Sequence, residues 1–100
     1  MSVLLELSVF SLGGDESKTK EVAKVIKTLQ DNGYKANLNP MGTVIESENI
    51  EQALNAIKIS HDCMDKDRFY MLAKFDCKPN VKNMLDGRVD KVLKAVENIK

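Results

Sequence analysis

The chain has little of several features that mark particular classes of protein. Its 100 residues include no tryptophan, only five aromatic residues and two prolines, and fifteen basic residues balance fifteen acidic ones. A chain with zero net charge lacks the basic surface typical of nucleic-acid-binding proteins and of proteins attracted to anionic membranes. Few aromatic rings also leave little with which to stack bases. We therefore expect no nucleic-acid partner and no membrane partner.

Cysteine and histidine are equally scarce. His61 is the single histidine, and Cys63 and Cys77 are fourteen positions apart, so one chain cannot supply the usual tetrahedral N/S metal site. A metal chaperone would need a CxxC pair, which is absent. The amino terminus has no basic region, and no run of about 20 apolar residues occurs. We expect no metal and no cofactor, and a cytoplasmic protein with reduced thiols.

What the chain does have is an ordinary apolar content and strong periodicity. Apolar residues make up 43% of it, and no linker, repeat or low-complexity segment interrupts it, so we expect a single domain over residues 1–100. Residues 3–11 alternate as a β-strand does, with an aliphatic core face and a mixed second face. These faces are Val3, Leu5, Leu7 and Val9, and Leu4, Glu6, Ser8 and Phe10.

A helix is predicted over residues 16–32, with Asp15 as its N-cap and Asn32-Gly33 as a left-handed end. Its apolar stripe is Val22, Val25, Ile26 and Leu29. The Gly13-Gly14 turn before it could hold a phosphate on free amides, but it matches no phosphate-binding motif and Asp15 and Glu16 would repel an anion. We interpret it as a plain turn.

A β-hairpin is predicted next, with strands near residues 34–38 and 43–46. Pro40 fixes its own φ in the turn, and Gly42 tolerates dihedral angles that other residues resist. Alternation places Glu46 with Val44 on one face, and Thr43 on the other. A carboxylate beside a glycine turn can form a small-molecule site, although an ordinary hairpin has the same residues.

The second half repeats the pattern. A helix over residues 50–64, capped by Glu48 or Asn49, is followed by a strand over 68–77 and a third helix capped by Asn80. The helix's apolar side is predicted to be Ile50, Ala53, Leu54, Ile57, His61 and Met64, and the strand's inward side Phe69, Met71, Ala73 and Phe75. A lone histidine there is typically packed and hydrogen-bonded, and Cys63 points about 200° away around the helix, which argues against a catalytic pair.

The order β-α-β-β-α-β, with an extra carboxy-terminal helix, predicts an α+β ferredoxin-like plait. Such a plait is a four-stranded antiparallel sheet with two helices on one face. The other face would carry many apolar groups and needs a cover, either the third helix or another subunit, and we favour a homo-oligomer. Its predicted members are Leu4, Glu6, Ser8, Phe10, Asn37, Val44, Glu46, Tyr70, Leu72, Lys74 and Asp76.

Three segments carry a resemblance to a known family. They are Glu-Leu-Ser-Val-Phe-Ser-Leu-Gly in the first strand, Gly-Asp-Glu-Ser before the first helix, and Asn-Pro-Met-Gly-Thr-Val-Ile-Glu in the hairpin. Over nearly its whole length the chain resembles the thiamine-binding protein family of small ferredoxin-like domains. Ser11 stands where the family usually has proline and Ser47 where it usually has glycine, and both border the expected pocket.

The resemblance implies a non-enzymatic domain that binds thiamine or its hydroxymethylpyrimidine portion and assembles into dimers and tetramers through its sheets. The implied binding residues are Ser8, Ser11, Pro40, Met41, Gly42, Thr43 and Glu46. From the chemistry, hydroxyls and free amides can bind the edge of an aminopyrimidine, Glu46 can accept its amino group or pair with the thiazolium charge, and Phe10 can contact the ring. Asn37 can also reach by strand parity.

Each candidate also has a structural explanation. Ser8 can fill the pleat, Phe10 and Met41 can pack at an interface, and Glu46 can pair with Lys74 across the sheet. The main alternative function is a regulatory or assembly domain whose open face only mediates oligomerisation. An acylphosphatase-like enzyme is disfavoured because no arginine accompanies the glycine turn to hold an anion.

Overall fold

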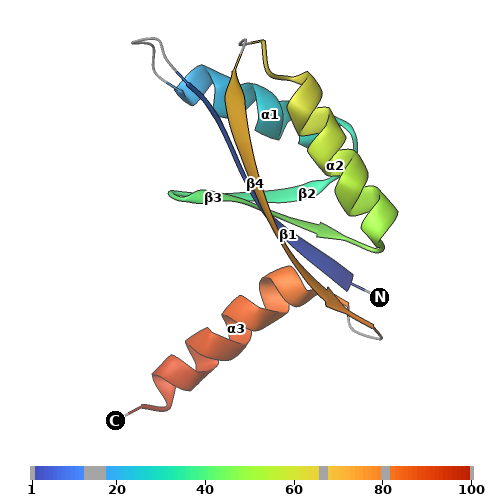
Figure 1. The fold of residues 1–100 in the computed structure, drawn as a ribbon. Helices are drawn as coiled ribbons and strands as arrows, with labels where there is room; N and C mark the ends of the chain where they lie inside the picture. Colours follow the sequence, from blue (N-terminus) through green and yellow to red (C-terminus); the bar gives the residue numbers. More distant parts are fainter. Residues whose placement is uncertain (1, 13–17, 66–67, 80–81, 100) are drawn as a thin grey trace.

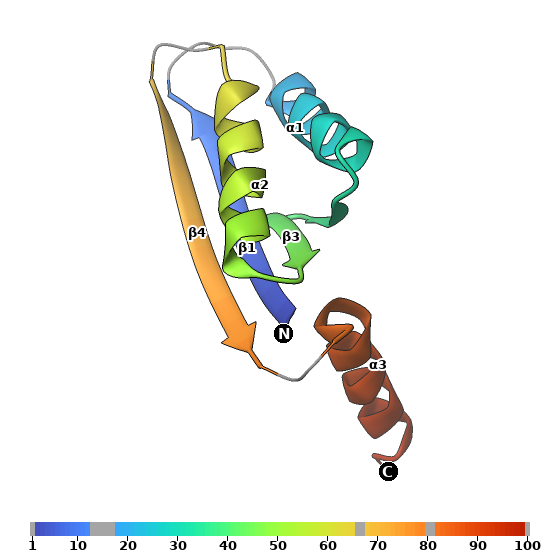
Figure 2. The ribbon, with the colours of Figure 1, turned by 90° about the vertical axis from the view of Figure 1, so that its right-hand side faces the viewer.

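The predicted plait is confirmed by the computed structural model in Figure 1, which describes residues 2–12, 18–65, 68–79 and 82–99. In chain order its elements are β1 (Ser2–Ser11), α1 (Thr19–Asp31), β2 (Lys35–Asn39), β3 (Gly42–Ser47), α2 (Ile50–Asp62), β4 (Phe69–Lys78) and α3 (Met84–Glu97). The strands form one sheet in the order β2-β3-β1-β4, and every neighbouring pair is antiparallel. Helices α1 and α2 lie together on one face of it (Figure 2).

The core forms where the aliphatic face of β1 meets these two helices. Leu5 is fully buried, pairs with Ile45 of β3 in the sheet, and packs in one cluster with Leu29 of α1 and Ala56 of α2. The strict alternation along β1 produces this arrangement, since successive side chains point to opposite faces. The predicted core face of the first strand is therefore confirmed.

The inward side of β4 is less covered than we expected. Phe69 and Met71 are partly buried, and Met71 packs against the core, but Ala73 and Phe75 remain exposed. All four share the face of Leu5 by their register with β1. Ala73 and Phe75 stay open because α2 packs mainly over β1 and β3 rather than over this edge strand.

In α2 the buried side agrees with the prediction only in part. Ala53 is buried as predicted, but Ala56 and Ser60 are buried as well, whereas the predicted Ile50 and Leu54 are exposed. Small side chains allow the helix backbone to approach the sheet closely, so this face is buried although its residues are less apolar. Of the two predicted N-caps, Asn49 is confirmed, because its side chain accepts a hydrogen bond from a backbone amide in the first turn.

The prediction that His61 is packed and hydrogen-bonded is confirmed only in part. Its Nδ1 lies 3.1 Å from Oδ1 of Asp62, and its ring centroid lies 5.3 Å from that of Phe69, but its side chain is 61% exposed. Hydrogen bonds from His61 and then from Lys58 lower the pKa of Asp62. The histidine follows the helix's solvent side because the buried face is rotated toward Ser60.

At the helix ends, Gly33 has a φ of 85°, so the predicted left-handed end of α1 is confirmed. The predicted caps Asp15 and Asn80 lie outside the described residues, and both were placed too early, because the N-cap positions are Lys18 for α1 and Asn83 for α3. Helix α3 leaves the sheet at the end where β1 begins, and only its first turn, with Met84 and Leu85, is buried (Figure 1). The chain's own third helix therefore does not cover the open face of the sheet.

Candidate functional site

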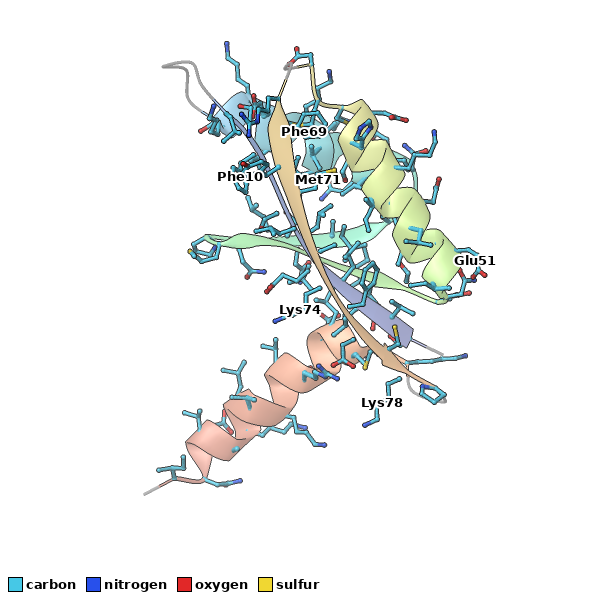
Figure 3. All side chains as sticks on the ribbon, viewed as in Figure 1. Phe10, Glu51, Phe69, Met71, Lys74 and Lys78 are labelled. Carbon is cyan, nitrogen blue, oxygen red and sulfur yellow. The ribbon has the colours of Figure 1, made fainter. Side chains whose placement is uncertain are left out.

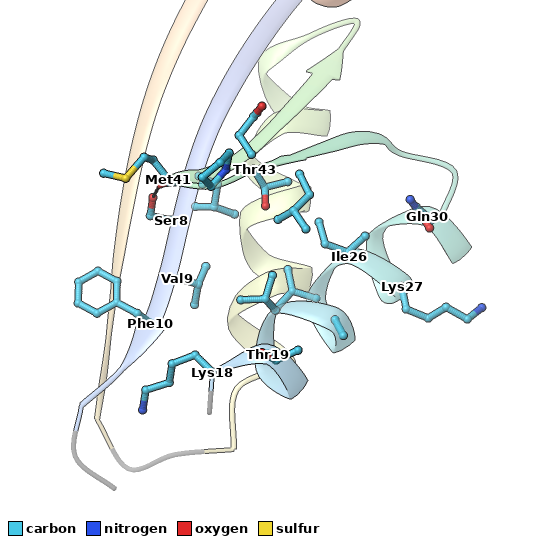
Figure 4. A pocket seen from close by; sticks show the side chains of 18 residues that line it. Ser8, Val9, Phe10, Lys18, Thr19, Ile26, Lys27, Gln30, Met41 and Thr43 are labelled. Carbon is cyan, nitrogen blue, oxygen red and sulfur yellow. Dashed lines mark hydrogen bonds between the residues drawn. The ribbon is translucent and has the colours of Figure 1, made fainter. Parts of the chain in front are cut away.

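A groove of about 970 Å³ lies between α1 and the β2–β3 hairpin, with β1 as its floor (Figure 4). Ligand pockets in proteins are commonly of this size. Val22 and Ile26 of α1 form one wall, and the residues from Leu38 to Thr43 form the other. The groove lies on the helix-bearing side of the hairpin and reaches past the tip to Ser8 and Phe10.

The hairpin tip owes its shape to a two-residue connection. Asn39 pairs with Gly42, which leaves Pro40 and Met41 as the loop. Neither loop residue has a positive φ. The turn is therefore not one of the mirror-image types, and the fixed φ of proline suits its first central position.

Gly42 is needed for a close approach rather than for unusual dihedral angles. Its φ is not positive, unlike that of Gly33. A Cβ added at position 42 would lie 3.0 Å from Ser8 Oγ and 3.2 Å from the carbonyl oxygen of Leu7. This reason replaces the one inferred from the sequence, and it explains how the tip can rest against β1.

A hydrogen bond joins the tip to the floor of the groove. The Ser8 hydroxyl donates to the carbonyl oxygen of Met41 over 3.1 Å (Figure 4). Met41 itself is 90% exposed at the rim, and Leu38 beside it is 62% exposed. An adaptable thioether and an aliphatic side chain therefore stand at the entrance, where they can close over a flat ring.

The lining offers a few polar groups among aliphatic ones. Ser8 and Thr43 contribute hydroxyls, and Asn39 and Gln30 contribute side-chain amides. An apolar surface with a small number of hydrogen-bonding groups is the usual makeup of a site for a small organic molecule. The arrangement can hold a flat, partly polar ring and bind its edge through the hydroxyls.

One end of the groove is closed by a polar cluster that fixes Ser11. The Lys18 ammonium donates to Ser11 Oγ over 2.7 Å, and the Ser11 hydroxyl donates to the Glu21 carboxylate over 2.8 Å. Lys18 lines the groove, whereas Ser11 is buried behind it. Ser11 therefore ties the end of β1 to the start of α1.

Glu46 lies elsewhere. It is four residues from Gly42 along β3, about 13 Å at the rise of a strand. It lines a second cavity, of about 370 Å³, that also includes Ser2, Ser47 and Asn83. Its carboxylate accepts hydrogen bonds from the Ser2 hydroxyl at 3.0 Å and from a backbone amide of α3 at 3.2 Å.

That amide belongs to Leu85, in the first turn of α3, whose amide groups have no partners within the helix. A carboxylate at this end also complements the helix dipole. Glu46 therefore holds α3 to the sheet, a role that the sequence did not reveal because donor and acceptor are 39 residues apart.

Two ion pairs surround this contact. Asp86 pairs with Lys35, and Arg88 pairs with Asp76 at 2.6 Å. The hydrogen bond that the Lys35 ammonium donates to Asp86, helped by the charges of Asp86 and Glu46, raises the pKa of Lys35 above its ordinary value. The structure thus anchors the first turn of α3 through the polar residues of the open face.

The predicted pairing of Glu46 with Lys74 was wrong, since Lys74 lies 3.6 Å from Glu6. Asn37 is exposed on the open face, opposite Val44 of β3. The groove thus brings together six of the nine predicted binding residues and leaves three outside its lining. Inside are Ser8, Phe10, Pro40, Met41, Gly42 and Thr43, and outside are Ser11, Asn37 and Glu46.

The α1 wall was missed by the sequence analysis. Val22 and Ile26 belong to the stripe assigned to the core, but only Val25 and Leu29 of that stripe are buried. The apolar stripe of α1 is wider than the part that the core buries, and this extra width was the signal in the sequence for a second apolar contact. Within the ranges that the structure describes, no three His, Cys, Asp or Glu residues are grouped to hold a metal, and no helix is long and apolar enough to cross a membrane.

The fold and the groove together define a small α+β domain with a pocket suited to an organic ligand. The sequence profile of the family described as "Thiamine-binding protein" matches residues 5–93. The chain belongs to this family, as its sequence resemblance predicted.

Relatives agree with this assignment. The UPF0045 protein MJ1052 of Methanocaldococcus jannaschii is 31% identical over 89 residues, covering 87% of this chain and 88% of its own. A UPF0045 protein of Methanothermobacter thermautotrophicus is 26% identical, covering 94% and 99%.

Solved structures show the same fold. The crystal structure of MJ1052 matches with a TM-score of 0.79 at 29% identity, covering 91% of this chain and 95% of that one. A Thermotoga maritima protein provisionally assigned to thiamine biosynthesis or salvage matches with a TM-score of 0.78 at 19% identity, covering 92% and 99%. At the latter identity the likeness concerns the fold alone.

Proposed function

We propose that the protein binds thiamine or its hydroxymethylpyrimidine portion in the groove between α1 and the hairpin, without turnover, as a cytoplasmic carrier, buffer or sensor. The main support for the proposal is that one segment is both characteristic of the family and part of the groove. The Pro40–Thr43 segment, which bears the most specific part of the family resemblance, forms one wall of the groove beside α1. The family's description as thiamine-binding supports a ligand of this class.

In the proposed complex the pyrimidine ring lies between the aliphatic wall of α1 and the hairpin tip. Ile26 and Met41 contact its faces, and the hydroxyls of Ser8 and Thr43 bind its edge. Ser8 already donates to Met41, so its oxygen remains available to accept from the ring's amino group. Phe10, at the mouth, packs edge-to-face on Tyr70 with ring centroids 5.5 Å apart, and it bounds the site on the sheet side.

Calorimetric titration of the purified protein with thiamine and with hydroxymethylpyrimidine tests the proposal. We expect saturable binding of at least one of them, and an affinity lowered about three- to tenfold by Ser8→Ala, the effect of one hydrogen bond. Ser2→Ala is the matched control, because Ser2 lies on the same strand but lines the other cavity. Absence of binding by both molecules at millimolar concentration would refute the proposal.

Glu46 needs its own test because its carboxylate is engaged at the root of α3. The family resemblance predicts that Glu46→Gln weakens binding without unfolding the protein. An unchanged affinity would remove Glu46 from the ligand site and leave it only its contact with α3.

We also propose a homo-oligomer that uses the open face of the sheet, where Tyr70 and Leu72 are 48% and 64% exposed. The same exposure favours the second candidate function, an assembly domain that binds no vitamin. The two differ in calorimetry: the assembly domain would self-associate and leave every thiamine-related molecule unbound.

A further inference from the structure

Strand β1 extends beyond one of its two neighbours in the sheet. β4 pairs with it over all ten of its residues, and Figure 3 shows Met71 of β4 beside its last part. β3 pairs with it only as far as Leu7, because β3 begins at Gly42, directly after the hairpin turn. The last residues of β1 therefore have one edge without a neighbouring strand.

Two contacts show which residues of β1 direct their backbone groups to this free edge. The amide of Leu12 donates to the carbonyl oxygen of Arg68, so the even-numbered residues at this end are bonded to β4. The carbonyl oxygen of Leu7 lies on the other side, 3.2 Å from a Cβ added at Gly42 of β3. In an antiparallel sheet both backbone groups of a residue point to the same neighbour, and successive residues alternate. The N–H and C=O of Val9 therefore point away from β4, past the place where β3 begins.

These two backbone groups lie at the floor of the groove. Val9 is one of its lining residues and lies between Met41 and Thr19 in Figure 4. Among the described residues, no group forms a hydrogen bond with the amide or the carbonyl oxygen of Val9. A ligand that displaces water from this floor must replace both hydrogen bonds, because unpaired polar groups in an apolar site are costly. Val9 therefore calls for a ligand with an acceptor and a donor side by side.

We propose that the free edge of β1 at Val9 binds a flat ring in which an amino group is next to a ring nitrogen. The amino group donates to the carbonyl oxygen of Val9 and the ring nitrogen accepts from its amide, so the ring continues the sheet in its own plane. This inference rests on the proposed function, since the pyrimidine portion of thiamine has such an edge. The second hydrogen of the amino group is left for the Ser8 oxygen.

The walls of the groove suit a ring in this plane. Ile26 of α1 lies on the helix-bearing side of the sheet, whereas Phe10 lies on the opposite face of β1 and Met41 stands at the rim. A ring that continues the sheet would therefore have apolar groups on both of its faces. Aromatic and thioether side chains form favourable contacts with such a ring.

The selectivity of this edge comes from the fixed roles of backbone groups. The hydroxyls of Ser8 and Thr43 can each donate or accept, so they adapt to either arrangement of a ring's edge. The amide of Val9 only donates and its carbonyl oxygen only accepts. A ring with an oxygen in place of the amino group, beside a protonated ring nitrogen, presents the reverse order and would leave both groups of Val9 unpaired.

Amide hydrogen exchange, followed by NMR, tests this geometry. In the free protein we expect the Val9 amide to exchange faster than that of Leu7, which pairs with β3, although both lie in the same strand. Saturating hydroxymethylpyrimidine should slow exchange at Val9. The amide of Leu5, which is buried and outside the groove lining, should be unchanged and is the matched control.

Calorimetry with hydroxymethylpyrimidine, and with the analogue in which an oxygen replaces its amino group, tests the selectivity. We expect the analogue to bind at least about tenfold more weakly, because it leaves buried backbone groups unpaired. Val9→Pro removes the donor without removing a hydrogen bond of the sheet, and free strand edges tolerate proline. Compared with Val9→Ala, which keeps the amide, it should weaken binding by a further three- to tenfold, roughly the effect of one hydrogen bond.

The outcomes separate this inference from the proposed function. Equal affinities for hydroxymethylpyrimidine and its analogue, or exchange at Val9 that the bound ligand leaves unchanged, would overturn the inference and leave the vitamin site in place. If neither thiamine nor hydroxymethylpyrimidine binds, the proposed function is refuted. Adenine and unsubstituted aminopyrimidine, at millimolar concentration, then decide the inference alone: slower exchange at Val9 with either would support it, and no change with both would overturn it.

Discussion

At Gly42 the hairpin comes so close to β1 that a single added methyl group would meet both Ser8 Oγ and the carbonyl oxygen of Leu7. The chemistry of the groove thus depends on a residue without a side chain. Gly42 allows the hydrogen bond from Ser8 to Met41, and that bond in turn fixes the rim.

We predict that Gly42→Ala destabilises the protein by about 1–3 kcal/mol, the usual effect of overpacking, and weakens ligand binding by displacing the tip. Urea unfolding and calorimetry measure the two effects. Gly87→Ala is the matched control: nothing lies within 4 Å of its added Cβ, and alanine favours helix, so it should stabilise by about 0.5–1 kcal/mol. Equal effects of the two substitutions would contradict the close approach.

Among the elements, α3 depends most on polar contacts. Its first turn is attached by Glu46 and by the pairs Lys35–Asp86 and Asp76–Arg88, which come from β2, β3 and β4. Exposed ion pairs contribute little singly, but these three contacts converge on one turn. The angle at which α3 projects therefore depends on charge, and so on pH.

The pair of Lys35 with Asp86 gives this dependence a direction. The pKa of Lys35 is raised in the folded protein, so the pair's stabilisation is complete below the ordinary value of 10.5 and is lost as pH rises through the folded value. We expect the difference in Tm between wild type and Lys35→Met to be constant from neutral pH up to that range and to shrink above it. A difference that grows with pH would contradict the assignment.

For the whole molecule, ligand binding and self-association should both raise Tm. At a ligand concentration 100 times Kd, binding adds about 2.7 kcal/mol. In a domain of 100 residues, 1 kcal/mol corresponds to roughly 4–8 °C, so Tm should rise by more than about 10 °C.

The two contributions separate by variant in a thermal-shift measurement. Ser8→Ala should reduce the rise with ligand and leave the rise with protein concentration unchanged, and Leu72→Asp, on the open face of the sheet, should do the reverse. A Tm that responds to neither ligand nor concentration in the wild type would contradict both proposals.

Much of this molecule follows from local sequence. The alternation along β1, the Pro40 turn and the Gly33 helix end predict the order of elements, and right-handed crossovers then leave one plausible topology for the sheet. The split of β1 into a core face and an open face also followed, because a strand's side chains alternate whatever surrounds them.

What only the tertiary structure decided were the contacts between distant segments. The groove needs α1 beside the hairpin, and Glu46 meets Leu85 across 39 residues, so neither is visible in a local pattern. The face that α2 buries was also decided there in part, since packing selected Ala56 and Ser60 over the larger Ile50 and Leu54. Periodicity is a property of neighbours in sequence, whereas a binding site is a property of neighbours in space.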